Sequence, residues 1–136
     1  MLVIDASAVA ELLLVRSAGE RVAHHIASHG YELHAPQLLD IEVLSALRRV
    51  VASGEASPAR AEEVVADLLE LPVERYPHDI LVSRVWELRE NFSAYDAAYL
   101  ALAEALTETG APLLTADARF ARAAETHSSV DVLVVG

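Results

Sequence analysis

The sequence predicts a three-layer α/β/α sandwich around a central parallel sheet of about five strands. Short apolar runs alternate along the chain with longer segments of helical composition. Strands separated by helices pair in parallel, and right-handed crossovers then place helices on both faces of the sheet. The 136 residues contain no internal repeat, low-complexity tract or Pro/Gly-rich linker, so we expect a single domain over residues 1–136.

Five short apolar runs are the expected strands. The first, Met1 to Ile4, ends at Asp5. The second and third are stopped by prolines, which break strands because they lack a backbone N–H. The expected strands are residues 1–4, 32–35, 72–76, 112–115 and 131–135.

Seven segments between these runs are the expected helices. Several carry ordinary start and stop signals, such as Pro58 at a helix start and Gly30, Gly54 and Gly110 at helix ends. The expected helices are residues 6–15, 18–28, 37–52, 58–70, 78–89, 93–107 and 118–124.

The composition limits the classes of function. There is no cysteine, which excludes disulfides, thiolate metal sites and cysteine nucleophiles. The formal charge is −11, and all 10 basic residues are arginine, which argues against a broad basic surface for nucleic acid. No apolar run approaches the roughly 18 residues of a membrane span, and residues 1–5 do not resemble a secretion signal. We therefore expect a cytoplasmic protein.

Four acidic residues are the candidate functional groups. Asp5 and Asp117 each follow an expected strand, and ligands of open parallel sheets bind beyond the carboxyl ends of strands. Glu42 and Asp96 lie on helix faces with many apolar neighbours. A carboxylate is costly to bury unless its charge is compensated, and a shared divalent cation would compensate it. Hard oxygen ligands suit Mg²⁺ or Mn²⁺.

Each of these acids also has a structural explanation. Asp5 and Asp117 can cap the helices that follow them. Ser93 to Asp96 has the pattern of a capping box, and Glu42 can lie on an exposed helix face. From the residues taken singly, both explanations remain open.

Taken together, four blocks of the sequence resemble the signature blocks of VapC-type PIN domains. The resemblance covers essentially the whole chain, with matching spacing, and the sequence does not depart from it at any of the four acidic positions. The blocks are Val3 to Val9 (VIDASAV), Ile41 to Val43 (IEV), Ala94 to Ala103 (AYDAAYLALA) and Leu114 to Phe120 (LTADARF).

The resemblance implies that Asp5, Glu42, Asp96 and Asp117 form one acidic pocket that binds Mg²⁺ or Mn²⁺. It further implies an endoribonuclease toxin that forms a homodimer and is neutralised by a VapB-type antitoxin. Three polar residues are expected to support the pocket. Ser7 and Thr115 would hydrogen-bond to the acids or to metal-bound water; alternatively, their hydroxyls make only local bonds at the helix start and the strand end. Asn91 would make a polar contact at the rim of the pocket; alternatively, it lies in a solvated loop.

The chemistry expected of such a pocket is hydrolysis by water activated on the metal. The predicted RNA products carry a 5′-phosphate and a 3′-hydroxyl, since water and not the 2′-hydroxyl attacks. Asp5 and Asp96 are the expected direct metal ligands, and Glu42 and Asp117 bind directly or through water. Arg48, Arg49, Arg119 and Arg122 can guide a phosphate backbone, although solvated helix faces explain them as well.

Other functions explain the sequence less well. His25 and His29 have metal-ligand spacing, but no glutamate lies between them and no further histidine is placed to complete a zinc site. The absence of lysine argues against receiver domains, aspartate phosphohydrolases and P-loops. Two alternatives remain: a non-catalytic PIN-like binding module, and a housekeeping PIN ribonuclease without an antitoxin.

Overall fold

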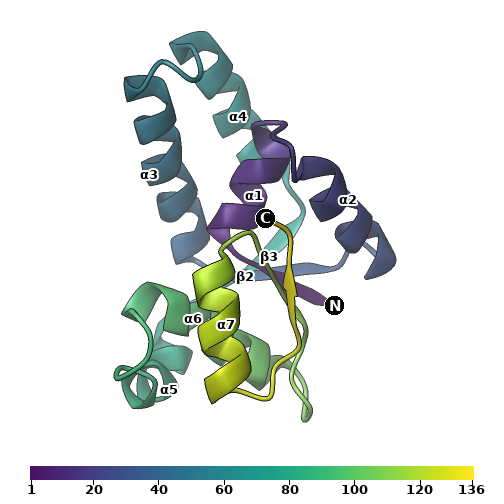
Figure 1. The fold of residues 1–136 in the computed structure, drawn as a ribbon, viewed down its shortest axis with the longest axis vertical. Helices are drawn as coiled ribbons and strands as arrows, with labels where there is room; N and C mark the ends of the chain where they lie inside the picture. The colour runs from purple at the N-terminus through teal and green to yellow at the C-terminus, as the bar shows by residue number, and fades with distance from the viewer.

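The computed structural model describes residues 1–136 and has the expected three-layer α/β/α architecture (Figure 1). Five parallel strands form one sheet in the order β3-β2-β1-β4-β5. The strands are β1 (Leu2–Ile4), β2 (Leu33–Pro36), β3 (Val73–Tyr76), β4 (Leu113–Thr115) and β5 (Val132–Val134). The helices are α1 (Ala6–Leu13), α2 (Gly19–Ser28), α3 (Leu38–Ala52), α4 (Pro58–Glu70), the 3₁₀ turn η1 (Asp79–Leu81), α5 (Val82–Glu87), α6 (Ala94–Leu106) and α7 (Ala118–His127).

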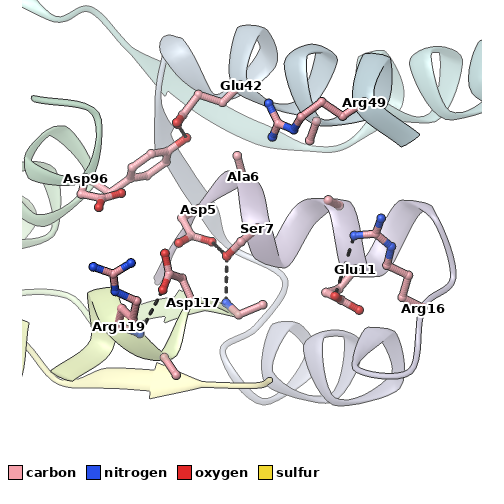
Figure 2. Close-up of a pocket in the computed structure, with 15 residues that line it drawn as sticks. Asp5, Ala6, Ser7, Glu11, Arg16, Glu42, Arg49, Asp96, Asp117 and Arg119 are labelled. Carbon is pink, nitrogen blue, oxygen red and sulfur yellow. Dashed lines mark hydrogen bonds and ion pairs between the residues drawn. The ribbon is translucent and has the colours of Figure 1, made fainter. Parts of the chain in front are cut away.

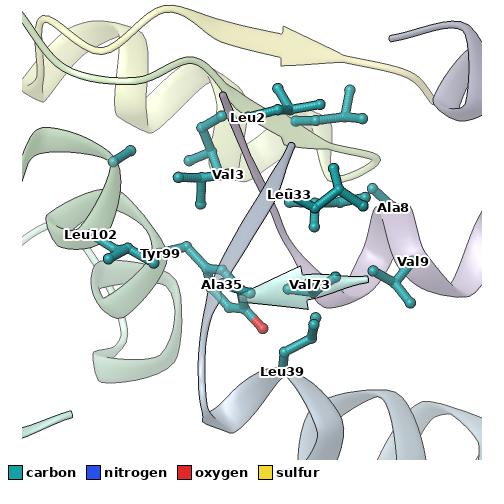
Figure 3. Packing of buried hydrophobic residues seen from close by; sticks show 14 of the residues in the cluster. Leu2, Val3, Ala8, Val9, Leu33, Ala35, Leu39, Val73, Tyr99 and Leu102 are labelled. Carbon is teal, nitrogen blue, oxygen red and sulfur yellow. The ribbon is translucent and has the colours of Figure 1, made fainter. Parts of the chain in front are cut away.

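The direction of the crossovers assigns each helix to one face of the sheet. The chain moves from β1 through β2 to β3 towards one edge, and then from β3 through β4 to β5 towards the other. With right-handed crossovers, α1 to α4 therefore cover one face, and α5 to α7 cover the other. In Figure 3, Tyr99 and Leu102 of α6 pack on one side of the strands, while Ala8 and Val9 of α1 pack on the other.

The core follows from this layering. Every residue of β1 is fully buried, as expected for a central strand covered on both faces. A single cluster of 35 buried hydrophobic residues joins the two helical layers through the sheet. Helices α3 and α4 extend beyond it as a pair (Figure 1). No helix combines the length and the apolar composition that crossing a membrane requires.

Three helices differ from the sequence-based expectation by more than one residue. The first helix ends at Leu13 and not at Val15, and the last continues to His127 and not to Ala124. The segment expected as one helix over residues 78–89 divides into η1 and α5. Apolar periodicity does not resolve such details, because tight turns and helices share composition.

The end of α1 has a strained turn. Arg16 N–H donates to the Glu11 carbonyl and Val15 N–H donates to that of Leu12, which is a Schellman motif. Val15 consequently has φ 53°, although the corresponding positions after α2 and α3 are glycines. The turn is needed because α2 packs closely on α1: a Cβ at Gly19 would lie 2.8 Å from the Glu11 carbonyl oxygen.

We expect Val15→Gly to raise the free energy of unfolding by about 0.5–1 kcal/mol. A left-handed conformation costs an L-residue about 1–2 kcal/mol, and the greater freedom of glycine in the unfolded chain offsets part of this gain. Val15 is exposed, so little packing is lost. Urea denaturation measures the change. Val15→Ala, which keeps the Cβ, is the matched control, and an equal gain in both variants would contradict the explanation.

Candidate active site

The candidate site lies where the two central strands end. From β1 the chain crosses towards one edge of the sheet and from β4 towards the other, so a crevice opens between their carboxyl ends. Ile4 pairs with Leu114, which places Asp5 beside Thr115 one residue further along. A cavity of about 610 Å³ opens there, lined by residues of α1, α3, α6 and the start of α7 (Figure 2).

All four acids predicted from the sequence line this cavity. Asp5 follows β1, Glu42 lies on α3, Asp96 lies in the first turn of α6, and Asp117 precedes α7. Segments separated by more than 100 residues in the sequence thus bring their carboxylates to one place. Burial and mutual repulsion at this place raise the pKa values of three of the four carboxyl groups.

Asp5 is the buried centre of the site. Its Oδ1 accepts hydrogen bonds from Ser7 Oγ at 2.6 Å and from Ala8 N at 3.0 Å, and its Oδ2 accepts one from Thr115 Oγ1 at 2.5 Å. Burial raises the pKa of Asp5 to about 6 against the lowering effect of these hydrogen bonds, and repulsion from Asp96 adds to the rise. Asp5 therefore both caps α1 and presents a carboxyl group with an unusual affinity for protons.

Ser7 and Thr115 connect the two strand ends. Their hydroxyl oxygens are 3.2 Å apart. Ser7 Oγ accepts the N–H of Ala116 at 2.9 Å, and Thr115 Oγ1 accepts the N–H of Asp117 at 3.0 Å. Both residues thus orient Asp5 and also fix the loop that carries Asp117.

Glu42 points into the cavity from α3, and it is half-buried rather than on an exposed face. Its Oε1 accepts a hydrogen bond from the hydroxyl of Tyr99 at 2.7 Å (Figure 2). Burial raises the pKa of Glu42, and repulsion from Asp96 adds to this effect while the Tyr99 bond opposes it. Tyr99 is buried and belongs to α6, so one hydrogen bond joins the two helical layers.

Asp96 and Asp117 complete the acidic group. The backbone N–H of Asp96 is capped by Ser93 Oγ at 3.1 Å, and burial followed by repulsion from Asp117 raises the pKa of Asp96. Asp117 Oδ1 caps α7 by accepting the N–H groups of Arg119 at 2.9 Å and Phe120 at 3.1 Å. The helix-cap explanation is therefore correct for Asp117, and the residue lines the cavity nonetheless.

The donor set fits a hard divalent cation. The four candidate groups are oxygen donors, and the pKa is raised for three of them, which means that a nearby positive charge would relieve their burial and repulsion. No three acidic or histidine side chains of the chain are close enough to surround one ion. One or two carboxylates would bind directly, with oxygen atoms of water or substrate as the remaining ligands, which is the coordination usual for Mg²⁺.

The cavity is also lined by residues that the sequence did not indicate, and four residues that it did indicate lie outside the lining: Arg48, Asn91, Thr115 and Arg122. Thr115 is fully buried and reaches the site through its hydrogen bond to Asp5. Glu11, Arg16 and Tyr99 line the cavity. Glu11 lies one helical turn after Ser7 and Tyr99 lies three residues after Asp96, so helical spacing from the known acids would have found both. Asn91 is exposed in the turn before Ser93 and does not line the cavity, as the solvated-loop alternative expects.

The PIN domain family model matches residues 2–126. The chain belongs to the PIN-domain family. Similar proteins include Ribonuclease VapC12 of Mycobacterium tuberculosis, which is 38% identical over 133 residues covering 98% of this chain and 99% of that protein. Ribonuclease VapC1 of the same organism is 43% identical over 122 residues, or 89% of each chain.

A solved structure shows the same fold. The crystal structure of PAE2754 from Pyrobaculum aerophilum superposes with a TM-score of 0.65 at 22% sequence identity, covering 96% of this chain and 81% of that one. The residue blocks that resemble VapC-type PIN domains all contribute to the cavity. The acidic cavity of this PIN domain is thus built from the segments that identify its family.

We expect Tyr99→Phe to lower catalytic activity about tenfold and to lower the free energy of unfolding by about 1.5–3 kcal/mol. The ring remains packed, but Glu42 loses the donor that orients its carboxylate, and a hydrogen bond to a charged group contributes about 1.5–3 kcal/mol. Initial cleavage rates at saturating metal, together with thermal denaturation, measure the two effects. Unchanged activity would mean that the Tyr99 bond serves only to join the layers.

Proposed function

We infer that this PIN domain is a divalent-metal-dependent endoribonuclease and the toxin of a toxin–antitoxin pair. The observation that carries the inference is the convergence of four carboxylates from separate segments on one crevice of the sheet. The relatives named VapC ribonucleases, which match nearly the whole chain, support RNA as the substrate. Such a substrate favours the cytoplasm as the place of action.

We propose that Asp5 and Asp96 bind the cation directly and that Glu42 and Asp117 bind it directly or through water. Mg²⁺ is the proposed ion, with Mn²⁺ as a substitute of the same ligand preference. When bound, the cation would activate water and screen the charge of the scissile phosphate. Ser7 and Thr115 hold Asp5 in position, and Tyr99 holds Glu42.

The decisive experiment is cleavage of total cellular RNA by the purified protein with Mg²⁺, with Mn²⁺ and with excess chelator. We expect discrete products with 5′-phosphate and 3′-hydroxyl ends that appear only when the metal is present. Cyclic phosphate ends, or cleavage that persists in chelator, would contradict metal-assisted hydrolysis. Absence of cleavage by folded protein free of antitoxin would favour the binding-module alternative.

We propose a VapB-type antitoxin as the partner. An apolar groove between α3 and α4, lined by Leu44, Leu47 and Val51 among others, together with the exposed Ile41, supports such a partner. Co-expression with the product of a short neighbouring reading frame should yield a complex without ribonuclease activity. A ribonuclease that no neighbouring gene product restrains would indicate the housekeeping alternative.

We also propose a homodimer in which a second apolar groove meets its copy. This groove, between η1, α5 and the start of α6, is lined by 11 residues, of which 9 are hydrophobic. Val82, Trp86 and Tyr95 are among them and are 61–66% exposed. A contiguous apolar surface of this kind on one face is typical of a self-complementary two-fold interface.

We expect Trp86→Glu to convert the dimer to a monomer, because the substitution places a charge in the apolar interface. Light scattering coupled to size-exclusion chromatography should show the molecular mass falling by half. Tyr31→Glu is the matched control, since Tyr31 is a similarly exposed aromatic residue outside the groove. Equal masses for wild-type protein and Trp86→Glu would contradict this interface.

A further inference from the structure

The active-site cavity has a basic end as well as an acidic one. Arg16 and Arg49 lie away from Asp96 and Asp117 (Figure 2). Arg16 follows α1 and Arg49 lies near the end of α3, so this end is framed by the two helices that flank the crevice. In a chain of net charge −11 with 10 arginines, two guanidinium groups at one end of an acidic cavity are a notable concentration.

Arg49 is available to bind an anion. Four arginines of the chain form ion pairs with carboxylates: Arg16, Arg60, Arg75 and Arg84. Arg49 is not among them, although five carboxylates line the same cavity. Its one side-chain hydrogen bond goes to Ser45 Oγ at 3.2 Å, which leaves most guanidinium donors free.

Arg16 is held at the cavity by two carboxylates. It donates to Glu55 at 2.7 Å, and its Nη1 is 4.0 Å from Glu11, whose Oε2 is buried without a hydrogen-bond partner. The Arg16–Glu55 pair is partly exposed, and such pairs contribute only about 0–1 kcal/mol. A phosphate can therefore replace Glu55, while Glu11 keeps the guanidinium facing the cavity.

The distances suit a single RNA strand. Glu42 and Arg49 are seven positions apart on α3, so they lie on one face of the helix and are ~10 Å apart along its axis. At about 3.4 Å per stacked nucleotide, this spans roughly three nucleotides. A second hollow shares Glu11 and Arg16 with the first and continues to Arg60, so the path extends beyond Arg16.

We propose that Arg49 and Arg16 form a phosphate subsite that binds the RNA backbone two to three nucleotides from the cleaved bond. The proposal rests on the ribonuclease function above. The guanidinium fork donates two parallel hydrogen bonds to phosphate oxygens, which sets the register of the strand. The acidic end then receives the scissile phosphate, while the basic end supplies the affinity that the negative protein otherwise lacks.

Binding is tested separately from cleavage. The probe is a fluorescent single-stranded RNA 12-mer of mixed sequence. All proteins carry Asp5→Asn, so that the RNA is bound but not cleaved. Fluorescence anisotropy in the presence of Mg²⁺ measures the affinity at several NaCl concentrations. Adding Arg49→Gln or Arg16→Gln should weaken binding about five- to twentyfold. Each should also lower the slope of log K against log salt by about one. Arg21→Gln, an exposed and unpaired arginine on α2 outside the cavity, is the control of equal charge.

A second measurement locates the contact. One phosphate of the RNA at a time is replaced by a neutral methylphosphonate. At one position, two to three nucleotides from the cleavage site, Arg49→Gln should no longer lower the affinity for the RNA. With otherwise wild-type protein, Arg49→Gln should raise KM more than it lowers kcat, and Arg49→Lys should restore part of the affinity.

The subsite is refuted if Arg49→Gln and Arg16→Gln weaken RNA binding no more than Arg21→Gln, or if they weaken only the binding of the antitoxin. Refutation of the ribonuclease function would give a different result from refutation of the subsite. In that case no variant cleaves RNA in any metal, whereas the anisotropy comparison still decides whether these arginines bind the backbone.

Discussion

Asp5→Asn is expected to reduce RNA cleavage about a thousandfold or more. The substitution keeps the size of the side chain but removes the charge of the most buried carboxylate in the cavity, which is a proposed direct ligand of the cation. Initial rates at saturating Mg²⁺ measure the effect. Asp67→Asn, an exposed acid on α4, is the control, and a loss of less than about tenfold in Asp5→Asn would remove Asp5 from the catalytic group.

The same substitution should stabilise the metal-free protein at neutral pH. Because the pKa of Asp5 is about 6 in the folded protein and 3.8 in the unfolded chain, the folded state binds the proton more tightly. The contribution of Asp5 to stability therefore falls as pH rises from about 4 to 6 and stays low above that range. Each pKa unit corresponds to about 1.4 kcal/mol, so the cost of the ionised group at pH 7.5 is about 3 kcal/mol.

Urea denaturation in chelator at pH 4 and pH 7.5 tests whether the ionised Asp5 destabilises the folded protein. Asp5→Asn should have the higher free energy of unfolding at pH 7.5, by about 2 kcal/mol once weaker hydrogen bonding by the amide is considered, and little advantage at pH 4. Adding Mg²⁺ should raise the stability of the wild type more than that of the variant. A variant less stable than wild type at both pH values would contradict a destabilising charge at Asp5.

Thr115→Val should increase the metal concentration needed for half-maximal activity about tenfold or more. Thr115 is fully buried and donates to Asp5, so valine keeps the volume but removes a hydrogen bond that lowers the pKa of Asp5. A hydrogen bond to a charged group contributes about 1.5–3 kcal/mol, which corresponds to a rise of about one unit or more in that pKa. Partners that orient metal ligands typically change metal affinity by 10–100-fold.

A pH–rate profile at subsaturating Mg²⁺ distinguishes this positioning role from a general loss of structure. The acidic limb of the profile should shift to higher pH in Thr115→Val and return in Thr115→Ser, which restores the hydroxyl. A uniform fall in rate without any shift would indicate that valine damages the fold and that Thr115 does not tune Asp5.

The sequence predicted the fold, and it predicted that the four acids would lie in one pocket, because both depend on local pattern. Alternating strands and helices allow few topologies, and in a parallel sheet Asp5 and Asp117 must lie at the same edge. The sequence did not resolve whether Asp117 is a cap or a site residue. In the structure Asp117 caps α7 through Oδ1 alone and also lines the cavity, so the cap leaves its second oxygen available. Whether a capping residue also lines a cavity depends on the positions of its two oxygen atoms, which the sequence does not specify.

Contacts between distant elements were beyond the sequence analysis. The pairing of Arg16 with Glu55 depends on how the turn between α3 and α4, which carries Glu55, packs against the end of α1. The expectation for Asn91 was based on its nearness to Ser93 in the chain, but nearness along a turn does not specify the direction of a side chain. The split of residues 78–89 into two elements depends on packing in the same way.

The bond between Thr115 and Asp5 joins residues 110 positions apart. During synthesis, Asp5 leaves the ribosome long before Thr115 and Asp117, and the nascent chain has neither the second strand end nor the fourth carboxylate. The order of translation thus delays assembly: the acidic cavity can be complete only after most of the polypeptide has emerged from the ribosome.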